Sequence, residues 1–165
     1  MQATPRGLRL TGKVLYLTED EAPLRAQLAG ETKLTHDPDR ALLNNISTDE
    51  ITPGWVCYYY DETLARYSMV GLRGNTVGKD AIKNGGFEGL VSGNSKGCGS
   101  SRETAPYSEL GAGIRLVVAK SIEKIYGQNA ENIGLLTTTD FGVLARLEAG
   151  EEIPLEEFTR GRDEI

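Results

Sequence analysis

Apolar residues in this chain fall into short runs separated by glycines and charged residues. The run at residues 8–17 is rich in β-forming residues and predicts a first strand or hairpin arm. The next segment, residues 19–28, has apolar positions Leu24, Ala26 and Leu28 and predicts a short amphipathic helix that ends at Gly30. Later runs predict strands at 66–72, 87–92, 114–119 and 133–137, and helical segments at 79–83, 121–128 and 141–147, with Ser121 as a cap.

This alternation of strands and helices after Gly85 predicts an α/β domain with a parallel core. The run IRLVVA at 114–119 is apolar and β-branched, as in a central strand. We expect one domain over 1–147, followed by a charged tail or linker over 148–165 in which Pro154 and Leu155 start a last short strand or turn. A natural chain end and a cut from a longer protein with further catalytic domains are both compatible with the final GRDEI.

Composition narrows the classes of function. The net charge of −6, with no basic run of five or more, argues against binding to nucleic acid. No apolar stretch is long enough to cross a membrane and the N-terminus lacks the apolar region of a signal peptide, so we expect a cytoplasmic protein without a membrane partner. Cys57 and Cys98 lack metal-ligand spacing and are expected to be free thiols, and His36 in its polar segment is expected to be inert.

The candidate chemistry lies in residues 95–110, which read SKGCGSSRETAPYSEL. Gly97 and Gly99 lead into Ser100, Ser101 and Arg102 at the expected start of a helix, which either serine can cap. Free N–H groups at a helix start attract anions, and an arginine fork suits a carboxylate. The residues alone thus indicate carboxylate or phosphate recognition, against the alternative of a glycine loop that only turns the chain. Neither the P-loop nor the dinucleotide fingerprint matches.

Three segments resemble motifs of the aconitase superfamily. GSSRETAPYSEL is similar to the G-S-S-R-E-H-A-P/A signature of its swivelling domain, with Thr104 in place of the usual histidine. NISTDEITP at 45–53 resembles the N-x-x-T-D-x-I-x-P element of the same domain. The segment at 114–136 is similar to the family's strand, A-x-S-F-x-x-I-F-x-x-N and N-x-G-L-L stretches. The chain is therefore identified as a swivelling β/β/α domain of this family.

The resemblance implies dehydration and rehydration of a hydroxy-polycarboxylate through an alkene. It implies that Ser100 is the general base, that Ser101 and Arg102 bind the substrate, and that Thr48 and Asp49 line the same site, with Asp49 orienting Arg102. From the residues alone, the alternative interpretation is a helix cap at Asp49. Within the family, the short domain and Pro53 favour the small subunit of 3-isopropylmalate dehydratase over aconitase or homoaconitase. A non-catalytic anion-binding module is the competing class.

This chain departs from the family pattern in its arginines and in its number of cysteines. The family often has an arginine two residues after the motif proline, where this chain has Trp55. Aconitases also carry a second substrate arginine some dozen residues past the motif aspartate, which falls near Asp61 here, and Arg66 or Arg73 could substitute for that one. The family's iron–sulfur cluster needs three cysteine thiolates and this chain has two cysteines, so we expect no metal here and a cluster in a large subunit or in fused catalytic domains. The domain should then be inactive alone, with the aromatic segment 54–60 and the acidic tail as candidate contacts to that partner.

Overall fold

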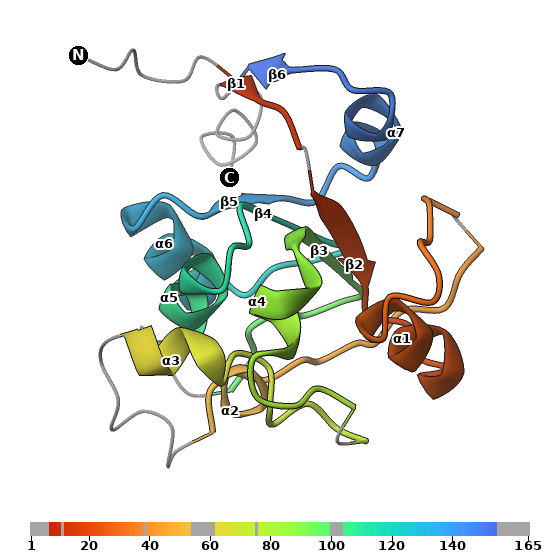
Figure 1. Ribbon diagram of the computed structural model, residues 1–165. Coiled ribbons are helices and arrows are strands. Elements are labelled where there is room, and N and C mark those ends of the chain that lie inside the picture. The colour runs from red at the N-terminus through yellow and green to blue at the C-terminus, as the bar shows by residue number, and fades with distance from the viewer. Residues whose placement is uncertain are drawn as a thin grey trace.

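A computed structural model describes residues 7–10, 12–37, 39–53, 62–74, 76–99 and 104–154 (Figure 1). Its strands are β1 (Gly7–Leu8), β2 (Lys13–Tyr16), β3 (Phe87–Ser92), β4 (Leu116–Ala119), β5 (Leu136–Thr138) and β6 (Ile153–Pro154). Its helices are α1 (Glu21–Leu28), α2 (Thr48–Ile51), α3 (Glu62–Arg66), α4 (Ala81–Gly85), α5 (Thr104–Gly111), α6 (Lys124–Asn132) and α7 (Gly142–Glu148).

The main sheet has the strand order β2-β3-β4-β5, and every pairing in it is parallel. In register, Leu15 pairs with Leu90 and Val91 with Val118. The expected parallel core with its strand at 114–119 in the interior is confirmed. Because parallel strands share one direction, the loops after β2, β3, β4 and β5 all leave from the same carboxyl edge of the sheet.

Alternate side chains of these strands point into different apolar cores on the two faces of the sheet. One core joins Leu15, Leu90 and Val117 to helices α1, α2, α4, α5 and α6. The other joins Tyr16 and Val118 to α7 and to the small antiparallel β1–β6 pair. Figure 1 shows the same layering, with β1, β6 and α7 on one side of the sheet and the other helices on the opposite side.

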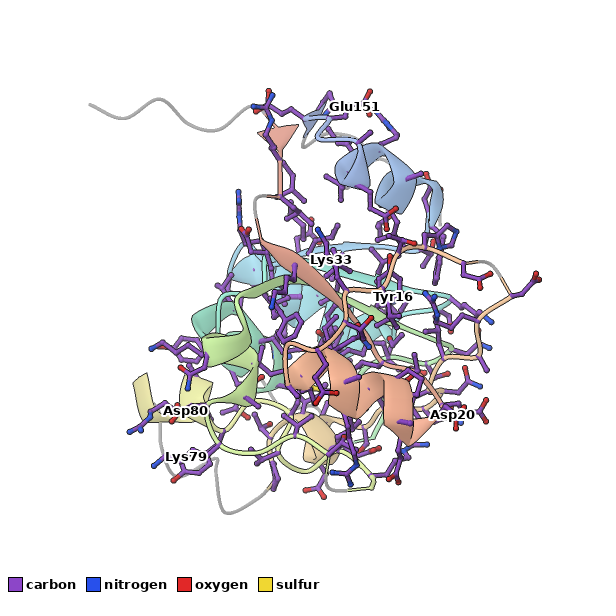
Figure 2. The ribbon with its side chains drawn as sticks, turned by 45° about the vertical axis from the view of Figure 1, so that its right-hand side comes forward. Tyr16, Asp20, Lys33, Lys79, Asp80 and Glu151 are labelled. Carbon is purple, nitrogen blue, oxygen red and sulfur yellow. The ribbon has the colours of Figure 1, made fainter. Side chains whose placement is uncertain are left out.

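The edge strand β2 is protected by a buried side chain. The amide of Gln27 on α1 accepts from the backbone N–H of Tyr16 at 2.9 Å and donates to its carbonyl at 2.8 Å. These are the groups that an edge strand otherwise leaves open to another chain. The ring of Tyr16, labelled in Figure 2, lies in the second core, and its hydroxyl donates to Glu148 at 2.9 Å. Burial and this carboxylate raise the pKa of Tyr16.

Several sequence-based boundaries are confirmed and some are wrong. The strand expected at 87–92, the helix at 19–28 and the helical segments near 79–83 and 141–147 are present, and Pro154 belongs to a last short strand. The run at 8–17 is broken into two strands that belong to different sheets. Residues 155–165, including Leu155, lie outside the described part of the chain.

The strand predicted at 66–72 is wrong, because this segment continues from α3 in successive turns. The N–H of Tyr67 donates to Leu64, that of Val70 to Tyr67 and that of Leu72 to Met69. Buried positions recur at Leu64, Ser68 and Leu72, which is helical rather than strand spacing. Among the described helices, none has the length and apolar character needed to cross a membrane.

Candidate functional site

Three motif segments meet at the carboxyl edge of the sheet. The loop after β3, residues 93–99, lies between the segment that leads into α2 and the segment that leads into α6. On the α2 side, Asn45 N–H donates to Asn94, Gly97 N–H to Ile46 at 2.7 Å, and Thr48 N–H to the carbonyl of Cys98 at 2.9 Å. The segments that resemble family motifs, though distant in sequence, are thus joined by backbone hydrogen bonds.

The α6 side of the loop is held by equally direct bonds. Lys96 N–H donates to the carbonyl of Ser121 at 3.1 Å, and its own carbonyl accepts from Glu123 N–H at 2.9 Å. The hydroxyl of Ser121 accepts from Ser95 N–H at 2.7 Å. The prediction that Ser121 caps the following helix is therefore wrong: α6 begins at Lys124 with Glu123 in the cap position, and Ser121 holds the loop instead.

The NISTDEITP segment folds as a single capped turn. Ser47 accepts from the backbone N–H of Glu50 at 3.1 Å, and the Glu50 carboxylate accepts from Ser47 N–H at 3.1 Å, which completes a capping box. The cap is Ser47, so the alternative interpretation of Asp49 as the cap is wrong. Thr48 is buried and Asp49, in the first turn, is exposed.

The same glutamate binds Arg73. Nε and NH2 of Arg73 donate to the Glu50 carboxylate at 2.9 and 2.8 Å, and NH2 also donates to the Asn45 carbonyl at 2.6 Å. Burial of the Glu50 carboxyl raises its pKa, but the hydrogen bonds from Arg73 and Ser47 outweigh burial, so the net pKa is lowered. Of the two candidates for the second substrate arginine, Arg73 lies at the motif turn, whereas Arg66 pairs with Asp80, labelled in Figure 2 at the start of α4.

The departure of the signature at Thr104 has a local explanation. The hydroxyl of Thr104, the first residue of α5, lies 3.2 Å from that of Thr52, and both side chains are buried. Thr52 also donates to the carbonyl of Thr48 at 3.3 Å. This pair of hydroxyls joins the start of α5 to the end of α2, so threonine at 104 is matched to threonine at 52.

The principal candidates Ser100, Ser101 and Arg102 lie outside the described residues, as does Glu103. The described chain stops at Gly99 and resumes at Thr104, so both ends of the signature segment are placed and lie beside α2. The aromatic segment 54–60, including Trp55 and Cys57, also lies outside the described part.

A buried polar cluster, absent from the sequence-based candidates, lies beneath this loop. Lys96 Nζ is 2.7 Å from Glu109 Oε2 and 4.9 Å from the centroid of the Tyr126 ring, and the Tyr126 hydroxyl donates to Glu109 Oε1. Both charged side chains are 0% exposed. Burial lowers the pKa of Lys96, although Glu109 opposes this, and burial together with Glu109 raises the pKa of Tyr126. No helical spacing or motif relates these residues, because the loop and two separate helices supply them.

The described residues contain no group of three histidine, cysteine or acidic side chains placed to hold a metal ion.

Comparison with known proteins identifies the family. The model of the Aconitase C-terminal domain matches residues 26–140. The chain belongs to this aconitase family. The resemblance drawn from the three motifs and the α/β swivelling fold expected from it are confirmed.

The aconitase-family relatives include small subunits of dehydratases. The isopropylmalate/citramalate isomerase small subunit of Methanocaldococcus jannaschii is 38% identical over 111 residues, which cover 67% of this chain and 64% of that one. The 3-isopropylmalate dehydratase small subunit of Helicobacter hepaticus is 36% identical over 119 residues, or 72% of this chain and 69% of that one. A solved structure described as 3-isopropylmalate dehydratase from Methanocaldococcus jannaschii is 35% identical and covers 57% of this chain and 55% of its own, with a TM-score of 0.48. The matched segment thus spans less than two thirds of the Methanocaldococcus subunit.

Proposed function

We propose that this chain is the small subunit, or swivel domain, of an aconitase-family hydro-lyase that isomerises a 2-hydroxy polycarboxylate, with 3-isopropylmalate as the substrate. The observation that carries the proposal is the bond from Thr48 N–H to the Cys98 carbonyl, which joins the NISTDEITP turn to the loop that enters the signature. Family membership and the dehydratase names of the relatives support the reaction class.

In this proposal Ser100 removes the proton from the substrate carbon. A serine hydroxyl holds its proton too tightly at neutral pH unless its surroundings stabilise the alkoxide. Backbone N–H groups at the start of α5 and the charge of Arg102 would supply that stabilisation. Ser101 would hydrogen-bond the substrate, and Arg102 would bind a substrate carboxylate in bidentate fashion. Thr48 and Asp49, beside Cys98, would complete the site, with Asp49 orienting Arg102.

The iron–sulfur cluster implied by the family does not fit this chain. Such a cluster takes three thiolates, and this sequence has two cysteines, Cys57 and Cys98. The described residues also lack any group of three potential ligands. We therefore assign the cluster to a large partner subunit or to fused catalytic domains. We expect this chain to have no activity without that partner, and we expect the assembled enzyme to be cytoplasmic.

The test is reconstitution with the cluster-bearing subunit under anaerobic conditions. Alkene absorbance is followed with isopropylmalate, citramalate, citrate and homocitrate, using each subunit alone as a control. Turnover of isopropylmalate only on mixing supports the proposal. Turnover of citrate or homocitrate instead would make the chain an aconitase or homoaconitase domain. A formed complex with an intact cluster and no turnover of any substrate would contradict the enzymatic role and favour the anion-binding module.

A further inference from the structure

The loop that enters the signature segment has three residues with left-handed backbone. Ser95, Gly97 and Gly99 have φ values of 56°, 86° and 94°, in the left-handed region. Glycine-rich chain of this kind has many accessible conformations, so its own residues do not select one. Something outside the loop has to hold it at a defined distance from α5, because the segment between them carries the proposed base and the arginine fork.

Lys96 extends from this loop into the interior beneath it. Its ammonium group donates to the Glu109 carboxylate on α5. Lys96 precedes the segment 100–103 in the chain and Glu109 follows it, so this contact connects the two flanks of the segment. Both side chains are wholly buried. Displacing the loop would separate Lys96 from Glu109 and leave a buried charge without its partner, which is strongly unfavourable.

Tyr126 on α6 ties this ion pair to the loop backbone. Its hydroxyl donates to Glu109, its ring lies under the Lys96 ammonium, and a Cβ on Gly97 would lie only 2.3 Å from its Cγ. The loop backbone therefore rests directly on the ring. The three side chains come from the loop, α5 and α6, so their contacts connect these three elements.

We propose that Lys96, Glu109 and Tyr126 are positioning residues that fix the loop 95–99, which leads into the signature, against α5. This proposal rests on the proposed hydro-lyase function for its catalytic consequence. Its structural consequence, a loop held against local opening, is independent of that function.

The test replaces the whole cluster with apolar residues, Lys96→Met with Glu109→Leu and Tyr126→Phe. No polar atom of the cluster is then left unpaired, and such replacements of buried ion pairs are often neutral or stabilising. We expect a thermal midpoint near that of the wild type. The amides of Gly97 and Thr48 form the hydrogen bonds between the loop and the segment that leads into α2. Their hydrogen exchange should be at least tenfold faster than in the wild type, while exchange at Leu90 and Val117 in the sheet is unchanged.

In the reconstituted enzyme the triple variant should lose at least tenfold in kcat with a smaller change in KM. The control, Glu21→Gln with Arg25→Gln, removes an exposed ion pair on α1 and should alter neither readout. A folded triple variant with wild-type exchange at Gly97 and Thr48 overturns the proposal. If wild-type subunits show no hydro-lyase activity, the proposed function fails, and the exchange experiment still decides the role of the cluster.

If the triple variant does not fold, the single variant Glu109→Gln tests the same proposal. Glu109→Gln keeps the shape of the side chain but removes the charge that Lys96 pairs with. Exchange at Gly97 at least tenfold faster than in the wild type, with the sheet amides unaffected, supports the positioning role. Wild-type exchange at Gly97 in this variant contradicts it.

Discussion

The hydroxyls of Thr52 and Thr104 lie 3.2 Å apart in the interior of the protein, at the junction of α2 and α5. Thr52 belongs to the NISTDEITP turn and Thr104 to the signature that follows the glycine loop. The residue by which this chain departs from the aconitase signature therefore contacts the NISTDEITP motif directly. The two candidate site segments are fixed to each other by their side chains as well as by their backbones.

Thr104→Val should test this junction, because valine keeps the shape and removes the hydroxyl. We expect a loss of about 1 kcal/mol in the free energy of unfolding, since Thr52 keeps its bond to the Thr48 carbonyl. Urea denaturation measures the change. Thr139→Val, at an exposed position, is the matched control and should change stability by less than about 0.5 kcal/mol. Equal effects at the two positions would contradict a specific role for the hydroxyl pair.

A side chain at Gly97 should destabilise the fold both through the left-handed backbone and through contact with the Tyr126 ring. Gly97 has φ +86° and a Cβ there would meet the Tyr126 ring, whereas Gly134 has φ +87° and open space around it. Gly134→Ala should therefore cost about 1–2 kcal/mol for the left-handed backbone alone. Gly97→Ala should cost about 2 kcal/mol more, through overpacking against Tyr126.

Thermal or urea unfolding of both glycine variants makes the comparison. The difference between them isolates the contact with the ring. If Gly97→Ala were no more destabilising than Gly134→Ala, the loop would not rest on Tyr126 as described.

Glu50 should make stability depend on pH in the acid range. Its pKa is lowered in the folded protein, mainly because Arg73 and Ser47 donate to the carboxylate against the opposing effect of burial. A lowered carboxyl pKa stabilises the fold above the pKa of an unfolded glutamate, about 4.3, and this contribution disappears as pH falls through the folded pKa. Glu50→Gln should therefore cost about 1 kcal/mol at pH 7, allowing for the half-exposed Arg73, and progressively less below about pH 4.

Unfolding free energies of the wild type and Glu50→Gln, measured from pH 7 to pH 3, check this dependence. Asp140→Asn is the control, at an exposed carboxylate that accepts a hydrogen bond from the backbone N–H of Gly142. A cost of Glu50→Gln that stays constant across the range would contradict the assigned role of the carboxylate.

Much of the fold followed from local patterns, and the failures have physical causes. The β-branched run at Leu116–Ala119 and the apolar run at Phe87–Ser92 are buried on both faces, so their composition alone indicates interior parallel strands. The strand prediction for the segment after Arg66 fails because its apolar residues are as frequent as in a strand, while their burial follows the turns of a helix. The prediction that Ser121 is a cap fails because a serine before a helix can instead accept a hydrogen bond from a neighbouring loop.

In the candidate site, too, the segments with a local motif could be predicted and the residues brought together by packing could not. The motifs located the NISTDEITP turn and the glycine loop, and the structure brings these two segments together. The cluster of Lys96, Glu109 and Tyr126 could not be predicted, since its members are brought together only by the packing of the loop 95–99, α5 and α6. A lysine and a glutamate in a sequence are ordinarily surface residues, and only the fold shows that these are wholly buried.

Gln27→Leu should expose the edge of the sheet. The buried amide satisfies both backbone groups of Tyr16, and leucine would leave a buried donor and acceptor unpaired. We expect a loss of about 2–4 kcal/mol in unfolding free energy and an increased tendency to self-associate through β2. Urea denaturation and sedimentation measure the two effects. Gln128→Leu, at an exposed position of α6, is the control. Wild-type stability of Gln27→Leu would show that β2 does not depend on this amide.

Ser100→Ala should separate proton removal from substrate binding in the reconstituted enzyme. If Ser100 is the base, its loss should lower kcat by about 10³-fold or more, since general base catalysis typically contributes 10² to 10⁴. The dissociation constant of the substrate should change little, because Arg102 rather than Ser100 is proposed to bind the carboxylate. Arg102→Lys should show the opposite pattern, with weakened binding, because an ammonium cannot reproduce the bidentate fork. Steady-state kinetics and calorimetric titration distinguish the two. Undiminished turnover in Ser100→Ala would remove the base from the mechanism and leave the loop with anion binding alone.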